Sequence, residues 1–245
     1  MSVYAYCLCE ELITDALESV AGVGDGAPRL LACGRLVAVV SEFDGEAAAV
    51  TREHVLAHER VIGRVLTETT PLPFRFGAVT SEARLRSYVA AHEPTLRAQF
   101  ARVRGCVEMS VKVLWPPEAA KPEAQHKTAS DAATEARTAN DAAPAGAGTA
   151  FLEAKRRALR GDELQRARAA EFESWLAVRL AGVVRATHVS VRPAAALVFA
   201  AAHLVERGRL AEYRARVRAA VAEAPALHFL TSGPWPPYSF SEENP

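Results

Sequence analysis

The stretch SGPWPPYSF, from Ser232 to Phe240, holds three prolines and three aromatic side chains within nine residues. It follows an apolar, strand-like run, and an earlier run of the same kind, VKVL, leads into the same Trp-Pro-Pro sequence at residues 115–117. Because proline has no amide hydrogen, Trp-Pro-Pro cannot continue an inner strand of a sheet. Each copy is therefore predicted to end the last strand of its half, which divides the chain into two parts.

The aromatic side chains of this stretch, Trp235, Tyr238 and Phe240, have two interpretations. In the first, they fold back and cover the core of the second domain, because buried aromatic residues mostly serve packing. In the second, they form a contact site for another protein, because side chains on a stiff, extended segment lose little entropy when they dock. The sequence leaves both open.

The composition is that of a soluble globular protein. The 245 residues are 50% apolar and 24% charged, and 29 basic residues balance 29 acidic ones. A formal charge of zero argues against a binder of nucleic acid or of an anionic lipid membrane, since both need a basic excess. The start, MSVYAYCLCEELI, lacks the pattern of a signal peptide, and no apolar run reaches the ~20 residues that span a bilayer. We therefore expect a cytoplasmic protein.

Residues 1–116 predict an α+β domain with a mostly antiparallel sheet. VYAYCLCEE is expected to be a strand, and RLLACGRLVAVVSEF, interrupted at Gly34, a hairpin or a bulged strand. Thr51 is expected to cap a helix. Its apolar face is predicted to comprise Val55, His58, Ile62, Val65 and Leu66. PLPFRFGAV is expected to be extended, and two short helices meeting at Pro94 and an alternating strand, CVEMSVKVLW, complete the domain.

Residues 117–149 are interpreted as an Ala/Pro-rich flexible linker or insertion. Between Trp115 and Phe151 the chain has no Val, Ile, Leu, Met, Phe, Tyr, Trp or Cys, so this segment cannot bury enough apolar surface to offset the entropy of ordering. Residues 150–245 then predict the element order αββαβ, ending in ALHFLTSGPW. This order is compatible with a ferredoxin-like split sheet that helices cover on one side.

Two groups of residues have the chemistry of metal ligands. His54 and His58 share a helix face beside Glu53 and Glu59, but the order is not HExxH and no third ligand is near. His58 is therefore expected to be a core or boundary histidine that makes one hydrogen bond. The four cysteines, Cys7, Cys9, Cys33 and Cys106, fit no zinc pattern and are expected to be reduced and structural. We expect no metal and no cofactor.

Arg75 lies between Phe74 and Phe76 in the stretch PFRFG. If this stretch is a strand, the two phenylalanines share one face and Arg75 points to the other. Arg75 is then either a buried arginine paired with Glu59 or Glu108, or an exposed residue that grips a partner. The sequence does not decide between these alternatives.

Two of these stretches also carry a family resemblance. TTPLPFRFGAV, from Thr69 to Val79, and GPWPPYSF, from Gly233 to Phe240, resemble the two signature stretches of the gas vesicle protein GvpL/GvpF family. Further stretches agree in order, among them YAYCL, LVAVVSEF, HERVIGRVL, GCVEMSVKVLW, AFLEAKRRAL and LVFAAAHLVERGRLAEY. The similarity spans the chain except for residues 118–148, where this sequence has an Ala-rich stretch that the family pattern does not require.

The resemblance implies an accessory or minor structural protein of gas vesicles, the protein-walled buoyancy compartments of some bacteria and archaea. It implies two α+β domains, binding to the small hydrophobic shell protein and to other accessory proteins, and a role in nucleating or assembling the wall. It also implies a location at the gas vesicle, including the gas-facing side of its wall, in addition to the cytoplasm.

We therefore expect a non-enzymatic binding protein. The candidate contact residues for its partners are Arg75, Phe76, Trp235, Tyr238 and Phe240. The alternative is a cytosolic enzyme with a site near His58, Glu59 and Arg75. These three side chains would have to gather around an open, polar pocket, whereas a closed salt bridge would favour the binding protein.

Overall fold

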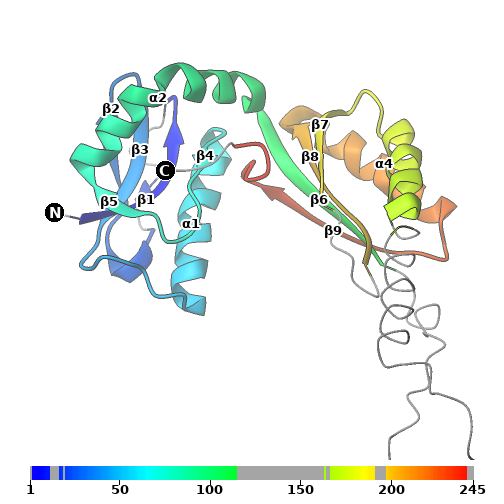
Figure 1. Ribbon diagram of the computed structural model, residues 1–245, viewed down its shortest axis with the longest axis horizontal. Helices are drawn as coiled ribbons and strands as arrows, with labels where there is room; N and C mark the ends of the chain where they lie inside the picture. Colours follow the sequence, from blue (N-terminus) through cyan, green and yellow to red (C-terminus); the bar gives the residue numbers. More distant parts are fainter. Residues whose placement is uncertain are drawn as a thin grey trace, which may run out of the picture.

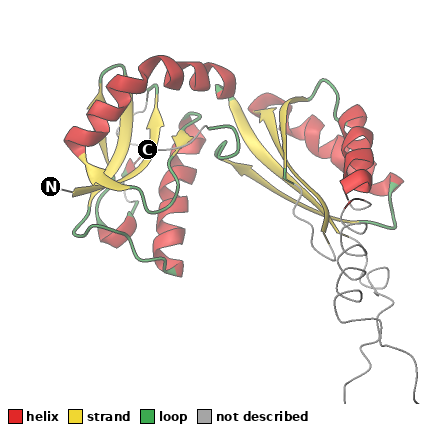
Figure 2. Cartoon of the chain, in the orientation of Figure 1, coloured by secondary structure: helices red, strands yellow, loops and turns green. Residues whose placement is uncertain are grey.

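The computed structural model of the chain describes residues 2–11, 17–18, 20–114, 163, 166–190 and 197–241. It contains two antiparallel sheets, each with its own helices, which lie on the left and on the right of Figure 1. Helix α2 (Glu82–Val103) runs from one to the other and leads directly into strand β6 (Cys106–Leu114). The predicted α+β class, with mostly antiparallel sheets covered by helices, is confirmed (Figure 2).

The first sheet has the order β2-β3-β1-β4, and β5 also pairs with β1. Its strands are β1 (Ser2–Cys9), β2 (Arg29–Cys33), β3 (Leu36–Glu42), β4 (Leu72–Pro73) and β5 (Val79–Ser81). The hairpin predicted around Gly34 is formed by β2 and β3, and a φ of 68° at Gly34 explains why glycine suits its turn. A short 3₁₀ helix, η2 (Val23–Asp25), precedes β2.

Both faces of β1 are buried because a helix covers each face of the first sheet. Tyr4, Tyr6, Cys7 and Cys9 pack in a cluster with α1 (Arg52–Glu68), whereas Val3, Ala5 and Leu8 pack in a cluster with α2. The pairing of β1 with β3 shifts register between Ala5 and Cys7, which places Cys7 on the same face as Tyr6. The four cysteines are buried and free of disulfides.

The start of α1 agrees with the sequence, but its buried face differs at one position. The Thr51 side chain accepts a hydrogen bond from the backbone N–H of His54, as expected of an N-cap. Val55 is 36% exposed, whereas Val61, which the predicted face did not include, is fully buried. The apolar face of the helix is therefore centred on His58, Val61, Ile62 and Val65.

The prediction of two short helices around Pro94 is wrong, since α2 is one helix of 22 residues with Pro94 inside it. Pro94 lies on the exposed side of α2. The carbonyl that loses its helical hydrogen bond to proline therefore faces solvent, where water satisfies it. The buried side chains on both sides of Pro94 continue one helical face, which holds the two turns together.

The second sheet has the order β7-β8-β6-β9, with all neighbours antiparallel. Its other strands are β7 (Val184–Val189), β8 (Leu197–Glu206) and β9 (His228–Trp235). Helix α4 (Leu210–Glu223), preceded by the 3₁₀ helix η3 (Arg207–Arg209), and a helix over residues 166–179 pack on one face. The element order is thus βαββαβ, which confirms the ferredoxin-like arrangement.

One strand was assigned to the wrong half. CVEMSVKVLW, which the sequence placed at the end of the first domain, is β6, the inner strand that pairs with both β8 and β9. Because β6 follows α2 directly, the sequence alone does not indicate that both of its neighbours, β8 and β9, come from the second half of the chain. The predicted linker at 117–149 and the start of the helix that opens the predicted second domain lie outside the described residues. Within the described ranges, no helix is long and apolar enough to cross a membrane.

Candidate functional site

The segment after β9 returns to the first sheet. We call residues 236–241 the C-terminal segment; it forms the turned loop that lies between the two sheets in Figure 1. Pro236 and Pro237 end the ladder of β9, and the chain then turns tightly, with the Tyr238 N–H donating to the Pro236 carbonyl at 2.8 Å and the Phe240 N–H to the Pro237 carbonyl at 3.1 Å. The predicted role of Trp-Pro-Pro as a strand terminator is thus confirmed here.

Tyr238 ends a chain of hydrogen bonds that starts in the first sheet. The Gly77 N–H donates to the Tyr4 hydroxyl at 2.9 Å, and the Tyr4 hydroxyl lies 3.0 Å from Nδ1 of His58. Nε2 of His58 lies 3.2 Å from the Tyr238 hydroxyl, which donates to Oε1 of Glu59 at 3.1 Å. Because Tyr238 gives its proton to Glu59, His58 carries its hydrogen on Nε2 and accepts from Tyr4.

This hydrogen-bond chain favours an uncharged His58. Burial lowers the pKa of His58 to about 4, because the imidazolium would lose its hydration. Burial and the nearby Glu59 carboxylate raise the pKa of Tyr238, and burial raises the pKa of Tyr4 to about 12. The phenols and the imidazole are thus neutral at neutral pH, as closed, structural hydrogen bonds require.

Ser239 attaches the C-terminal segment to β6. Its backbone N–H donates to Oε2 of Glu108 at 2.8 Å and its hydroxyl donates to Oε1 at 3.0 Å. Burial raises the pKa of Glu108, while the two hydrogen bonds from Ser239 and the nearby His188 lower it. Glu108 therefore depends on Ser239 for much of the stabilisation of its buried carboxylate.

Phe240 fills the space where the two sheets meet. Its side chain is 7% exposed and packs in one cluster with Leu96 and Phe100 of α2 and with Leu204 of β8. Its carbonyl accepts a hydrogen bond from Arg102 near the end of α2. The C-terminal segment thus contacts α1, α2, β6 and β8, and we call this set of contacts the joint.

The interpretation that the aromatic side chains cover a core applies to Tyr238 and Phe240, but the core is not the predicted one. Tyr238 and Phe240 cover the core of the first sheet and the joint rather than the core of the second domain. Trp235 covers neither, because it is 44% exposed and its Nε1–H donates to the Ser232 hydroxyl at 3.1 Å. Glu59 and Glu108, which the sequence suggested as partners of Arg75, are instead the acceptors for this segment.

The two remaining candidate contact residues, Arg75 and Phe76, lie in the loop between β4 and β5. Phe74 and Phe76 do not share a face, since Phe74 packs in the cluster with α2 and Phe76 packs beside Tyr4 and His58. The reason is a turn at Phe76 and Gly77, where Gly77 has a φ of 93°. Arg75 is exposed, so its interpretation as a buried arginine does not hold.

The geometry does not favour the alternative enzyme site. His58 is 1% exposed and both ring nitrogens lie against tyrosine hydroxyls. Glu59 accepts from Tyr238, whereas Arg75 lines a cleft that neither His58 nor Glu59 reaches. His54 faces outward, with its Nδ1 2.9 Å from the Ala49 carbonyl, so the two histidines do not converge on one point. The three side chains therefore do not surround one pocket.

On the face of the second sheet opposite α4, α2 and Phe240 pack against Leu204 of β8, whereas the described residues leave the β6 and β9 part largely exposed. We call the side chains on this face of β6 and β9 the open face: Ser110, Lys112, Leu230, Ser232 and Trp235. The antiparallel register pairs Lys112 with Leu230 and Ser110 with Ser232, so paired side chains lie on the same side. Leu230 is 55% and Trp235 44% exposed. Exposed apolar side chains that share one face of a sheet are candidates for contact with a partner protein.

Comparisons with known proteins agree with this architecture. A family model described as "Gas vesicle synthesis protein GvpL/GvpF" matches residues 2–242. Gas vesicle protein L2 of Halobacterium salinarum is 29% identical over 266 residues, which cover 98% of this chain and 91% of that protein. Gas vesicle protein L of a Streptomyces species is 30% identical over 260 residues, which cover 97% of this chain and 92% of that protein.

Solved structures show the same fold. The crystal structure of gas vesicle protein GvpF from Anabaena sp. PCC7120 matches with a TM-score of 0.75 at 17% identity, covering 99% of this chain and 97% of that chain. GvpF from Microcystis aeruginosa matches with a TM-score of 0.74 at 20% identity, covering 99% of both chains. The match of the family model over nearly the whole sequence decides the relationship: this chain belongs to the GvpL/GvpF family of gas vesicle synthesis proteins.

Proposed function

We propose that this chain is a non-enzymatic accessory protein of the gas vesicle that binds the small hydrophobic shell protein and supports nucleation and assembly of the wall. Membership of the family supports a role in gas vesicle formation. The binding of the shell protein and the role in nucleation and assembly go beyond family membership and are our proposal. The observation that carries it is the open face, on which Leu230 and Trp235 of β9 present apolar side chains to solvent on the side of the sheet opposite α4.

The open face has the composition of a binding surface for an apolar partner. Trp235 is a large, rigid aromatic residue, and such residues contribute more than most to the energy of an interface. Lys112 and the two serines lie beside it and offer polar contacts at its rim. A hydrophobic shell monomer that covers Leu230 and Trp235 would be kept from aggregating with other monomers.

The joint supports this function by fixing the open face relative to the first sheet. Tyr238 and Phe240 connect β9, which carries Leu230 and Trp235, to α1 and α2, and Ser239 attaches the same segment to β6. Binding then costs little ordering of the protein, because the surface is held in place beforehand. In this proposal Trp235 contacts the shell protein, Tyr238, Phe240 and Phe76 hold the body together, and Arg75 serves the separate cleft described below.

The experiment is co-purification of the shell protein with this chain, paired with electron microscopy of a deletion strain complemented by each variant. The double variant Leu230→Ser, Trp235→Ser is expected to weaken binding by about 2 kcal/mol or more, or about thirtyfold. The matched control is Val178→Ser. Val178 is 74% exposed on the helix over residues 166–179, which covers the opposite face.

The control is expected to bind the shell protein like the wild type and to restore vesicles. Circular dichroism and thermal unfolding establish that the double variant is folded. Normal vesicles and undiminished binding in the folded double variant would refute the open face as the contact surface. An equal loss in Val178→Ser would show that any exposed apolar residue matters, which also contradicts the proposal.

A further inference from the structure

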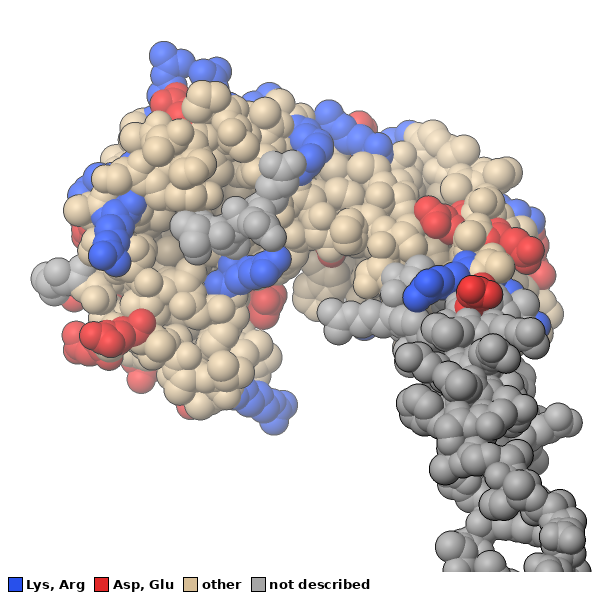
Figure 3. All heavy atoms as spheres, viewed as in Figure 1, with Lys and Arg blue, Asp and Glu red and all other residues tan. Residues whose placement is uncertain are grey.

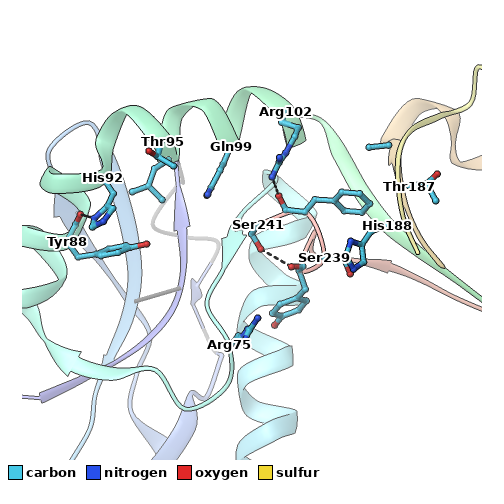
Figure 4. A pocket seen from close by; sticks show the side chains of 14 residues that line it. Arg75, Tyr88, His92, Thr95, Gln99, Arg102, Thr187, His188, Ser239 and Ser241 are labelled. Carbon is cyan, nitrogen blue, oxygen red and sulfur yellow. Dashed lines mark hydrogen bonds between the residues drawn. The ribbon is translucent and has the colours of Figure 1, made fainter. Parts of the chain in front are cut away.

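A cleft of about 850 Å³ opens beside the joint. Its walls come from the middle and end of α2, from β7, from the loop between β4 and β5, and from the C-terminal segment. In Figure 4, Gln99 and Arg102 reach into it from α2, Arg75 reaches toward it from the opposite side, and His188 faces it from β7. The cleft shares no residue with the open face.

The charged side chains of the cleft are of one sign. Arg75 and Arg102 line it together with His92 and His188, and none of its lining residues within the described part of the chain is aspartate or glutamate. On the face shown in Figure 3, basic side chains also dominate the part of α2 that leads to β6. In a chain with a formal charge of zero, a concave site whose described lining has two arginines and no carboxylate favours an anionic ligand.

The cleft also has apolar walls, which suit a peptide better than a phosphate. Leu96, Ala186 and Phe240 line it between the basic residues, and Tyr88 adds an aromatic ring. Phosphate sites in proteins are usually built from helix N-termini and glycine-rich loops. Here α2 begins at Glu82, well before the residues that line the cleft, and no glycine is among the described lining residues.

We propose that this cleft binds an acidic, partly apolar peptide segment of a partner protein. Its carboxylates would meet the guanidinium of Arg75 and the cationic rim around Arg102, since arginine and carboxylate form paired hydrogen bonds of matching geometry. Its apolar side chains would pack on Leu96 and Phe240. The inference goes beyond the proposed function, because it concerns different residues and its test does not use the shell protein.

The test is fluorescence anisotropy with a labelled peptide of repeated Glu-Glu-Leu and a matched peptide of repeated Gln-Gln-Leu. The wild type is expected to bind the acidic peptide at least about tenfold more tightly than the glutamine peptide, and Arg75→Glu is expected to lose about tenfold. The matched control is Arg35→Glu, at the exposed turn between β2 and β3, which is expected to change the affinity by less than about twofold. Arg102 is left unchanged, because it also holds Phe240.

Absence of binding by the acidic peptide, equal binding of the two peptides, or equal losses in Arg75→Glu and Arg35→Glu would overturn the proposal. Displacement of the peptide by inorganic phosphate at an equal concentration would also overturn it, because the site would then be one for a small anion. A variant that ends at Ser241, and so lacks Glu242 and Glu243, is expected to bind at least as tightly as the wild type. A loss of binding in that variant would place the peptide outside the cleft and contradict the inference.

Discussion

Ser239 and Glu108 lie 131 positions apart in the sequence and form two hydrogen bonds, from one backbone N–H and one hydroxyl to the two oxygens of one carboxylate. Glu108 is 8% exposed. A buried carboxylate needs such donors, and these come from the segment that closes the joint. The second sheet and the C-terminal segment are therefore stabilised together.

Removal of the Ser239 hydroxyl tests this coupling. Ser239→Ala leaves one oxygen of a buried carboxylate without its donor and is expected to lower the free energy of unfolding by about 1.5–3 kcal/mol at neutral pH. The hydroxyl stabilises the charged form, so its contribution is present above the pKa of Glu108 and is lost as the pH falls through that pKa. Urea unfolding at neutral and at acidic pH measures both effects.

The control for this change is Ser174→Ala, whose hydroxyl donates to the Ala170 carbonyl within one exposed helix. We expect a change within about 0.5 kcal/mol there. Equal effects of the two substitutions, or an effect of Ser239→Ala that does not depend on pH, would count against the role given to Glu108.

The close approach of β9 to β6 predicts a strict need for glycine at position 233. Gly233 has a φ of 116°, and a Cβ there would lie 2.8 Å from the Glu108 carbonyl oxygen and 2.9 Å from Sδ of Met109. Gly233→Ala is therefore expected to destabilise the protein by more than about 1–3 kcal/mol, because backbone strain and a clash with backbone add together. Thermal and urea unfolding measure the loss.

Gly208→Ala in η3 is the matched control, because a Cβ at Gly208 meets no atom within 4 Å and its φ is not in the positive region. It is expected to be neutral or slightly stabilising. A neutral Gly233→Ala would show that β9 can move away from β6 without cost.

Acid is expected to weaken the joint through His58. The unfolded histidine has a pKa near 6.5, whereas burial lowers the pKa of His58 to about 4 in the folded protein. The neutral form is therefore favoured by folding, and this contribution is present above pH 6.5 and is lost as the pH falls toward 4. The loss amounts to about 3 kcal/mol. His203, whose pKa burial also lowers to about 4, acts in the same direction.

The measurement is the free energy of unfolding from pH 7 to pH 4 for the wild type and for His58→Gln. The variant is expected to lose less stability over this range, because one of the two buried imidazoles is gone. NMR of the wild type provides a second readout, in which the ring signals of His58 stay constant between pH 7 and pH 5. A titration of His58 within that range would be incompatible with a closed joint.

The Tyr238 hydroxyl is expected to matter more than an ordinary tyrosine hydroxyl. Tyr238→Phe removes the hydroxyl that accepts from the Nε2–H of His58 and donates to the Glu59 carboxylate. The loss is expected to lower the free energy of unfolding by about 1–3 kcal/mol. Tyr88→Phe is the control, since the Tyr88 ring is half-buried on α2 and packs on His92. Urea unfolding of both variants distinguishes them, and similar losses would contradict the hydrogen-bond chain.

The local features of the fold were predictable because their causes are local. The Thr51 cap, the hairpin at Gly34 and the ending of β9 at the second Trp-Pro-Pro sequence depend on residues within a few positions of each other. The single helix α2 was also within reach: Leu85, Val89, Leu96, Phe100 and Val103 keep helical spacing across Pro94, and this continuous face outweighs the breaking effect of one exposed proline.

The placement of β6 and of the joint could not be read in the same way. The alternation of apolar residues in β6 fits any sheet, so only its pairing with β8 and β9 decides where it belongs. Likewise, Tyr238 meets His58 across 180 positions and Ser239 meets Glu108 across 131. A single sequence holds no signal for such pairs. The sequence left the exposure of Arg75 open, and the structure places it before the turn at Gly77 with its side chain exposed.

The position of β6 has a consequence for the order in which the protein is made. The first sheet and both of its covering helices emerge from the ribosome as one continuous stretch, and β6 follows at once. Its two neighbours, β8 and β9, are translated much later, on the order of ten seconds at bacterial rates of about 5–20 residues per second. During this interval the nascent chain carries a first half that still lacks Tyr238 and Phe240, and one unpaired strand, so the second half acquires its fold only when distant codons have been read.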